Sequence, residues 1–212
     1  MMKLDVTRTA LPGVLILAPG RIRDQRGFFS ETYNHRSLAA AGIELDIVQE
    51  NHSLSRRRGV VRGLHFQTPP HAQAKLIRVT RGAILDVVVD IRCGSPTYGQ
   101  HLAVELSADN WQQLLVPTGF AHGFCALSDS CEVLYKVTAY YAPDSEAGIL
   151  WNDPALGIAW PACAERAIVS SRDAGLPLLA DIDSPFVFAE DGHTGEGRDR
   201  QPRVSALGGA SR

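Results

Sequence analysis

The 212-residue sequence carries no strong excess of charge, no long apolar segment and no paired-cysteine motif. Its 21 basic and 23 acidic side chains give a formal net charge of −2, which provides no electrostatic basis for binding nucleic acid or an anionic membrane. No segment approaches the roughly 20 apolar residues that a membrane-spanning helix requires. With 45% hydrophobic and 21% charged residues, the composition is typical of a soluble globular protein.

The four cysteines, Cys93, Cys125, Cys131 and Cys163, have no metal-ligand spacing. We interpret them as small buried side chains of a protein in a reducing compartment. The apolar run Val14–Ala18 is shorter than the roughly 7–15 residues of a secretory signal and is interpreted as a strand. The sequence therefore predicts a cytoplasmic protein.

Few segments of the sequence have the pattern of a helix. Asn34–Gly42 is predicted to be a short helix with an asparagine cap and a glycine stop, and Ser107–Trp111 one further helical turn. The predicted strands are Val14–Ala18, Asp46–Gln49, Val60–Phe66, Lys75–Thr80, Ala83–Ile91, His101–Leu106, Gln112–Pro117, Ala121–Leu127 and Cys131–Tyr141. Many short strands separated by turn-forming residues predict an all-β fold, here a double-sheet jelly roll with a few short helices.

The composition changes after Pro185. Residues 189–212 contain five glycines and no aromatic side chain, so they cannot bury enough apolar surface to offset the entropy lost on ordering. We predict a single domain over residues 1–188, followed by a flexible C-terminal tail over residues 189–212.

Polar side chains occur at inward-facing positions of the predicted strands. Because side chains alternate along a strand, Tyr135, Lys75 and Asp86 each share a face with apolar neighbours, and His65 lies on the face of Val61. A buried lysine needs an anion, and Asp86 is the predicted counter-charge. A single such group is more often a satisfied core residue, but four of them in one interior indicate an acid–base site.

Two segments resemble the motifs of cupin jelly rolls, namely Gly59-x5-His65 for the first motif and Pro117-x-Gly119-x-x-His122 for the second. In metal-binding cupins the first motif continues with a second histidine and a glutamate. Here Gln67 stands in place of that histidine, no carboxylate follows, and Lys75 enters the site. Two histidines beside an ammonium group make a poor site for a divalent cation, so we predict no metal and disfavour a metal-dependent dioxygenase.

Within the cupins, the sequence resembles the dTDP-4-dehydrorhamnose 3,5-epimerases over roughly Leu11–Pro177. The segments that carry the resemblance are Asp24–Glu31, Gln49–Ser53, Gly59–Gln67, Gln73–Lys75, Asp86–Arg92, Gly119–Phe124, Leu134–Lys136, Trp151–Pro154, Trp160–Pro161 and Ser171–Asp173. Many ordered matches make the resemblance specific for the family, and less specific for the exact sugar.

The resemblance implies conversion of dTDP-4-dehydro-6-deoxy-D-glucose to dTDP-4-dehydro-L-rhamnose by inversion at C3 and C5. By resemblance, His65 is the base that removes the proton beside the C4 ketone, and Asp173 orients it. Lys75 stabilises the enolate oxygen, and Tyr135 returns a proton from the opposite face. No cofactor is implied.

The resemblance also implies a nucleotide-binding set. It comprises Arg26, Glu31, Gln49, Glu50, Asn51, Arg62, His122, Glu146 and Arg172, with Tyr141 stacking on the thymine. Strict alternation would place Arg62 and His65 on opposite faces of the strand, although the resemblance implies that both contact one ligand. A bulge or bend at Gly63 is one way to bring them together. Alternatively, Arg62 reaches the substrate around the strand end. The basic run Arg56–Arg58 is better explained as a solvated turn than as a phosphate clamp.

Two alternatives stay open at this point. One is an epimerase that inverts C3 or C5 alone in an antibiotic-sugar pathway, and the other is a non-catalytic cupin that binds a nucleotide sugar. The family resemblance further implies a homodimer in which the Arg26–Glu31 segment reaches the partner's nucleotide site. In that arrangement Phe28 and Phe29 are both buried, one in its own sheet and one against the neighbouring subunit.

Overall fold

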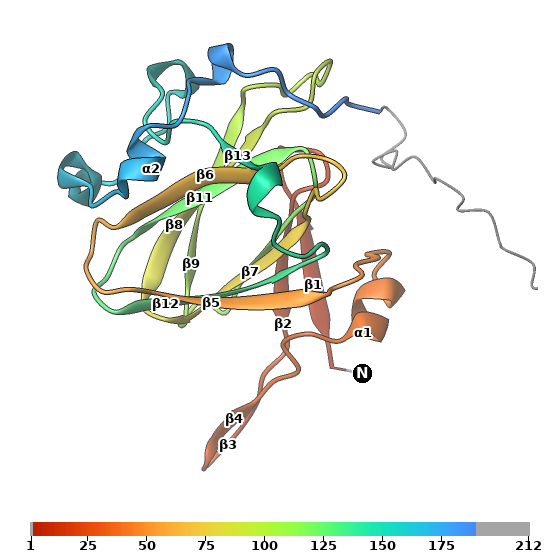
Figure 1. Cartoon of the computed structure of the whole chain (residues 1–212). Coiled ribbons are helices and arrows are strands. Elements are labelled where there is room, and N and C mark those ends of the chain that lie inside the picture. Colours follow the sequence, from red (N-terminus) through yellow and green to blue (C-terminus); the bar gives the residue numbers. More distant parts are fainter. Residues whose placement is uncertain (1, 190–212) are drawn as a thin grey trace, which may run out of the picture.

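The computed structural model describes residues 2–189 of the chain (Figure 1). Two antiparallel sheets form the body of the protein. The six-stranded sheet has the order β1 (Leu4–Arg8), β2 (Leu15–Pro19), β10 (Gln113–Val116), β7 (Lys75–Arg81), β12 (Cys131–Val137) and β5 (Gln49–Ser55). The five-stranded sheet has the order β13 (Glu146–Gly148), β6 (Val61–Gln67), β11 (Phe120–Ala126), β8 (Ala83–Asp90) and β9 (His101–Ser107).

The main hydrophobic core lies between these sheets. Ile77 and Val133 of the six-stranded sheet and Ile84 and Val88 of the five-stranded sheet belong to one buried cluster. Their burial follows from the alternation of apolar and polar residues, which turns one face of each sheet inward. The predicted all-β, double-sheet fold is confirmed.

A two-stranded hairpin extends from the body and is formed by β3 (Ile22–Asp24) and β4 (Gly27–Phe29) (Figure 1). It was not predicted as a separate element, and neither were β1 and β13. The strand predicted over Asp46–Gln49 is wrong, because pairing begins at Gln49 and continues to Ser55. The strand predicted to reach Tyr141 ends at Val137.

The predicted first helix is confirmed as α1 (His35–Ala40), whose cap residue Asn34 accepts hydrogen bonds from the Arg36 and Ser37 amides. Ser107–Trp111 is a turn and not a helix. The remaining helical segments are α2 (Ser171–Ala174), η1 (Pro143–Ser145), η2 (Pro154–Leu156), η3 (Ala162–Arg166) and η4 (Leu179–Asp181). Within residues 2–189, no helix has the length and apolar character needed to cross a membrane.

The prediction that the cysteines are buried is confirmed for two of the four. Cys125 and Cys131 are buried as expected, but Cys93 is exposed and Cys163 is only half-buried. The predicted tail over residues 189–212 lies, apart from Ala189, outside the described residues.

The pairing of β6 with β11 is irregular at Gly63. His65 lies opposite His122, whereas Arg62 lies opposite Phe124, so β6 carries one extra residue between these pairs. Gly63 has a φ of +118°, and a Cβ atom on it would lie 2.6 Å from Gly123 Cα. Only glycine fits such a close approach at this φ. The expected bulge at Gly63 is confirmed, and it changes the direction of the side chains on either side.

Candidate active site

His65 and Asp173 form a hydrogen-bonded pair at the inner face of β6. The His65 Nε2–H donates to Asp173 Oδ1 at 3.0 Å, and Asp173 Oδ2 accepts the Gly63 amide at 3.0 Å. Asp173 lies on α2, where Ser170 caps the turn by accepting the Asp173 amide. Both carboxylate oxygens are therefore held, and His65 Nδ1 is left as the basic nitrogen.

The two members of this pair have shifted pKa values. Burial lowers the pKa of His65, and the opposing charge of Asp173 only partly offsets this. Burial would raise the pKa of Asp173, but hydrogen bonds from the Gly63 amide and from His65 hold that pKa below its ordinary value. The result is a neutral imidazole beside an ionised carboxylate, which is the state that a general base requires.

Lys75 lies at the start of β7 and faces the interior, as predicted. Its Nζ donates to the backbone oxygen of His65 at 3.2 Å. Burial lowers the Lys75 pKa to about 8, against the opposing charges of Asp86 and Glu146. Asp86 is a counter-charge to Lys75, as predicted, but it acts without a hydrogen bond to Nζ, because both of its oxygens accept from His122 Nε2, at 2.9 and 3.0 Å. The ammonium group is thus held beside the base without a bonded carboxylate.

Tyr135 faces inward from β12, in line with the buried residues Val133 and Val137. It lies opposite Asn51 of β5. Burial raises the pKa of the Tyr135 phenol, while the Arg62 charge lowers it. The phenol therefore keeps its proton at neutral pH and can act as an acid.

Glu146 of β13 connects two residues of the predicted nucleotide set. Its Oε2 accepts from the Tyr141 hydroxyl at 2.6 Å and from Arg172 Nη1 at 2.7 Å. Burial would raise the Glu146 pKa, but these two bonds hold it below the ordinary value. Arg172 immediately precedes Asp173, so one short helix carries both an exposed guanidinium and the partner of the base.

The inner face of β5 contributes Gln49 and Asn51. Gln49 Nε2 donates to Asn51 Oδ1 at 2.8 Å, and Gln49 Oε1 accepts the Tyr141 amide at 3.0 Å. Arg62 crosses from β6 to the far end of β5, where it donates to Leu54 O at 3.2 Å. Glu50 points to the other face, pairs with Lys136 and is not brought together with the cluster.

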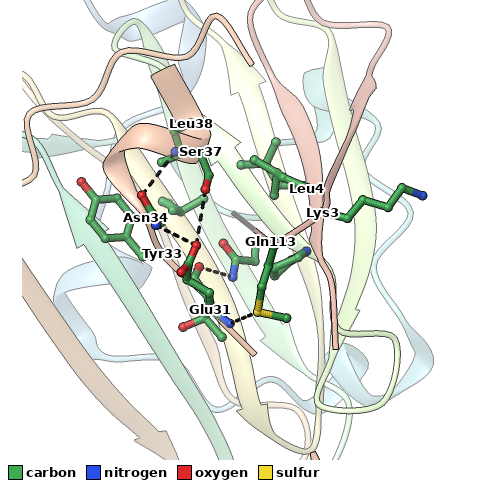
Figure 2. Close-up of a pocket in the computed structure, with 13 residues that line it drawn as sticks. Lys3, Leu4, Glu31, Tyr33, Asn34, Ser37, Leu38 and Gln113 are labelled. Atoms are coloured by element: carbon green, nitrogen blue, oxygen red, sulfur yellow. Dashed lines mark hydrogen bonds between the residues drawn. The ribbon is translucent and has the colours of Figure 1, made fainter. Parts of the chain in front are cut away.

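Arg26 and Glu31 also lie outside the cluster of their own chain. Arg26 pairs with Asp24 in the β3–β4 hairpin. Glu31 accepts from Asn34 Nδ2 at 2.7 Å and lines a cavity of about 20 Å³ beside α1 (Figure 2). The hairpin exposes apolar side chains, since Phe28 is 51% and Phe29 67% exposed. Within the chain neither phenylalanine is buried.

Gln67 has a structural role that the sequence analysis missed. Its Nε2 donates to His71 O at 2.6 Å and Tyr140 O at 3.1 Å, and its Oε1 accepts the Ala142 amide. The amide thus holds two backbone segments beside the site. Among residues 2–189, no three His, Cys, Asp or Glu side chains are grouped as metal ligands. The Ser170 cap was also missed, although Ser at the position three before Asp173 fits an N-cap pattern.

Known proteins resemble this chain in sequence and in structure. A family model described as dTDP-4-dehydrorhamnose 3,5-epimerase matches residues 8–181. A protein of that name from Salmonella typhimurium is 51% identical over 175 residues, which cover 82% of this chain and 94% of the relative.

Solved structures show the same similarity. A dTDP-6-deoxy-D-glucose-3,5-epimerase from Legionella pneumophila, in complex with dTDP-4-keto-L-rhamnose, is 42% identical with a TM-score of 0.83 and covers 88% of this chain and 100% of its own. A 3′-monoepimerase from Streptomyces bikiniensis, in complex with dTDP-quinovose, is 36% identical with a TM-score of 0.76. The match covers 81% of this chain and 86% of that protein's chain.

Proposed function

Because the chain belongs to the dTDP-4-dehydrorhamnose 3,5-epimerase family, we propose that it inverts C3 and C5 of dTDP-4-dehydro-6-deoxy-D-glucose to form dTDP-4-dehydro-L-rhamnose. The observation that carries the proposal is the His65–Asp173 pair beside the Lys75 ammonium, with Tyr135 facing the same interior. This arrangement provides a base, a fixed positive charge and an acid. The protein is an isomerase.

The chemistry requires these three groups because the protons at C3 and C5 are acidic only through the C4 ketone. We assign proton removal to His65 Nδ1, with Asp173 fixing the ring and stabilising the imidazolium that forms. Lys75 carries the charge that stabilises the enolate oxygen. Tyr135 then donates its phenolic proton to the opposite face of the carbon. In this scheme the protein's own side chains supply every charge, and no redox step occurs.

We assign the nucleotide to the region around Tyr141, Glu146 and Arg172, with Gln49 and Asn51 lining the approach along β5. The guanidinium groups of Arg62 and Arg172 suit a diphosphate, because their forked donors match its oxygens. His122 is held by Asp86 on the neighbouring strand and faces His65 across the pairing of β6 with β11.

The function is tested by proton exchange in D₂O. We expect deuterium to enter both C3 and C5 of the substrate, because each inversion passes through an enolate that is reprotonated from solvent. Product analysis by NMR distinguishes this enzyme from one that inverts a single carbon. Exchange at one carbon only would favour the single-site epimerase. Exchange at neither carbon would contradict the proposed function and favour a non-catalytic protein that binds a nucleotide sugar.

The activity should depend on pH through His65 and Lys75. Burial lowers the His65 pKa below 6.5, so the neutral base is lost only as pH falls through that lowered value. The Lys75 charge is lost as pH rises through about 8. We expect a bell-shaped profile of kcat/KM with its alkaline limb near pH 8. In the Lys75→Arg variant that limb should move upward, since arginine does not lose its proton in this range; an unchanged limb would contradict the assignment.

We further propose that the enzyme works as a homodimer in the cytoplasm, with the Arg26–Glu31 segment completing the partner's nucleotide site. Support comes from the hairpin, which projects from the body (Figure 1) and exposes the side chains of Ile22, Phe28 and Phe29. Arg26 and Glu31 lie outside the cluster of their own chain. A hairpin with exposed apolar side chains is suited to docking on a second copy related by two-fold symmetry.

Mixing two inactive variants tests the shared site. One variant carries His65→Ala and the other Arg26→Ala with Glu31→Ala. If the two contributions come from different chains, mixed dimers should regain one complete site and a measurable part of the activity. Subunit exchange is verified with differently tagged copies. Confirmed exchange without recovered activity would contradict the shared site.

A further inference from the structure

Ser53 lies in the middle of β5, on the face that points into the protein. Pairing with β12 places Ser53 opposite the buried Val133, and places Asn51 opposite Tyr135. Because side chains alternate, Ser53 shares this inner face with Asn51 on one side and Ser55 on the other. It therefore faces the same interior as Tyr135.

The hydroxyl of Ser53 differs from its polar neighbours in having no bonding partner. Gln49 and Asn51 bond each other, and Ser55 Oγ accepts Arg62 Nε at 3.4 Å. Among residues 2–189, Ser53 Oγ is the one buried side-chain oxygen or nitrogen that makes no hydrogen bond. A buried hydroxyl without a partner lowers stability, so such a group in an otherwise satisfied site points to a role with a ligand.

The charge next to Ser53 indicates which ligand group it would meet. Arg62 reaches β5 at the two residues that follow Ser53, donating to Leu54 O and Ser55 Oγ. At the opposite end of the strand, Gln49 contacts Tyr141. A nucleotide lying along β5 with its base at Tyr141 would bring its diphosphate toward Arg62. A hydroxyl can donate to a phosphate oxygen, and a hydrogen bond to a charged group is stronger than one between neutral groups.

We propose that Ser53 is a further substrate-binding residue, whose Oγ–H donates to a diphosphate oxygen beside Arg62. The inference rests on the proposed placement of the diphosphate at Arg62. Asn51, Ser53 and Arg62 then form one continuous polar surface beside the acid.

The test compares the Ser53→Ala variant with the wild type in two measurements. The first is the affinity for dTDP by calorimetry, which should fall about tenfold, as expected when one hydrogen bond to a charged group is lost. In kinetics the same loss should raise KM and leave kcat near its normal value, because the contact is made equally in ground and transition states. Ser53→Thr keeps a hydroxyl and should restore most of the affinity.

The second measurement is thermal unfolding without ligand. Ser53→Ala should keep the wild-type Tm or raise it, since no hydrogen bond within the protein is lost. The matched control is Ser95→Ala, because the buried Ser95 hydroxyl donates to Asp90 Oδ2 at 2.7 Å. That variant should lower Tm and leave dTDP affinity unchanged. The two serines thus separate a ligand contact from a structural bond.

Any other result shows whether the assignment of Ser53 or the placement of the diphosphate is wrong. Wild-type dTDP affinity in Ser53→Ala would overturn the inference, as would a Tm loss like that of Ser95→Ala. Normal affinity for dTDP with weakened affinity for the complete sugar nucleotide would place the hydroxyl on the sugar and overturn the diphosphate assignment. Arg62→Gln is measured in parallel. If it binds dTDP normally, the placement of the diphosphate is wrong, independently of Ser53.

Discussion

The His65→Ala variant is expected to lose both epimerisation and solvent exchange at C3 and C5, with a fall in rate of roughly 10²–10⁴-fold, as is typical for removal of a general base. His65 Nε2 is held by Asp173, and no other histidine shares that carboxylate in the described part of the chain. Affinity for dTDP should stay near normal, because the base contacts only the sugar. Exchange is followed by NMR in D₂O and binding by calorimetry.

Tyr135→Phe supplies the contrast for this experiment. Proton removal precedes reprotonation, so the phenylalanine variant should turn over slowly and still exchange the protons beside the ketone. The substitution removes one oxygen and keeps the ring that packs against the core beside Val133. If Tyr135→Phe loses exchange as completely as His65→Ala, the tyrosine is not the acid. Normal exchange in His65→Ala would remove the histidine from its assigned role.

Lys75→Met is expected to lower kcat by about 10²–10³-fold, the usual cost of losing one charge that stabilises an oxyanion. Methionine fills similar space without the ammonium group. The folded state should tolerate it, because burial already disfavours the charge enough to lower the Lys75 pKa to about 8. Steady-state kinetics measure the first effect, and thermal unfolding measures the second.

The matched control for Lys75 is Arg81→Met at the other end of β7. Arg81 is exposed, and within residues 2–189 its one ion pair is with Glu132 at 3.9 Å, so its loss should leave kcat and Tm nearly unchanged. Wild-type kcat in Lys75→Met would show that the enolate is stabilised by another group. Unfolding of the methionine variant would be distinguished by circular dichroism, and Lys75→Arg then tests the charge in a folded protein.

Local patterns in the sequence were enough to predict which side chains face inward. Period-two alternation correctly placed Tyr135, Lys75 and Asp86 in the interior, and the Asn34 cap with a following glycine correctly predicted α1. These features depend on neighbouring residues of one chain segment. The family resemblance supplied the roles of the residues, which alternation cannot assign.

Contacts between distant segments were decided by tertiary structure. Asp173 meets His65 across 108 residues of sequence, and Asp86 bonds His122 because the register of β8 with β11 brings those strands together. Asp86 therefore acts on Lys75 through its charge and makes no hydrogen bond to it. Register is set by the packing of whole sheets, so it is not readable from a single strand.

By itself, the sequence determined the all-β class, the inward faces and the family, because these follow from residue order alone. The tertiary structure decided that strand alternation is broken between Arg62 and His65, through the bulge that Gly63 forms against Gly123. It also decided that Ser53 lies buried without a partner and that the hairpin bearing Phe28 projects from the body. The physical reason is that burial and bonding are properties of packed neighbours, which only the folded chain brings within contact distance.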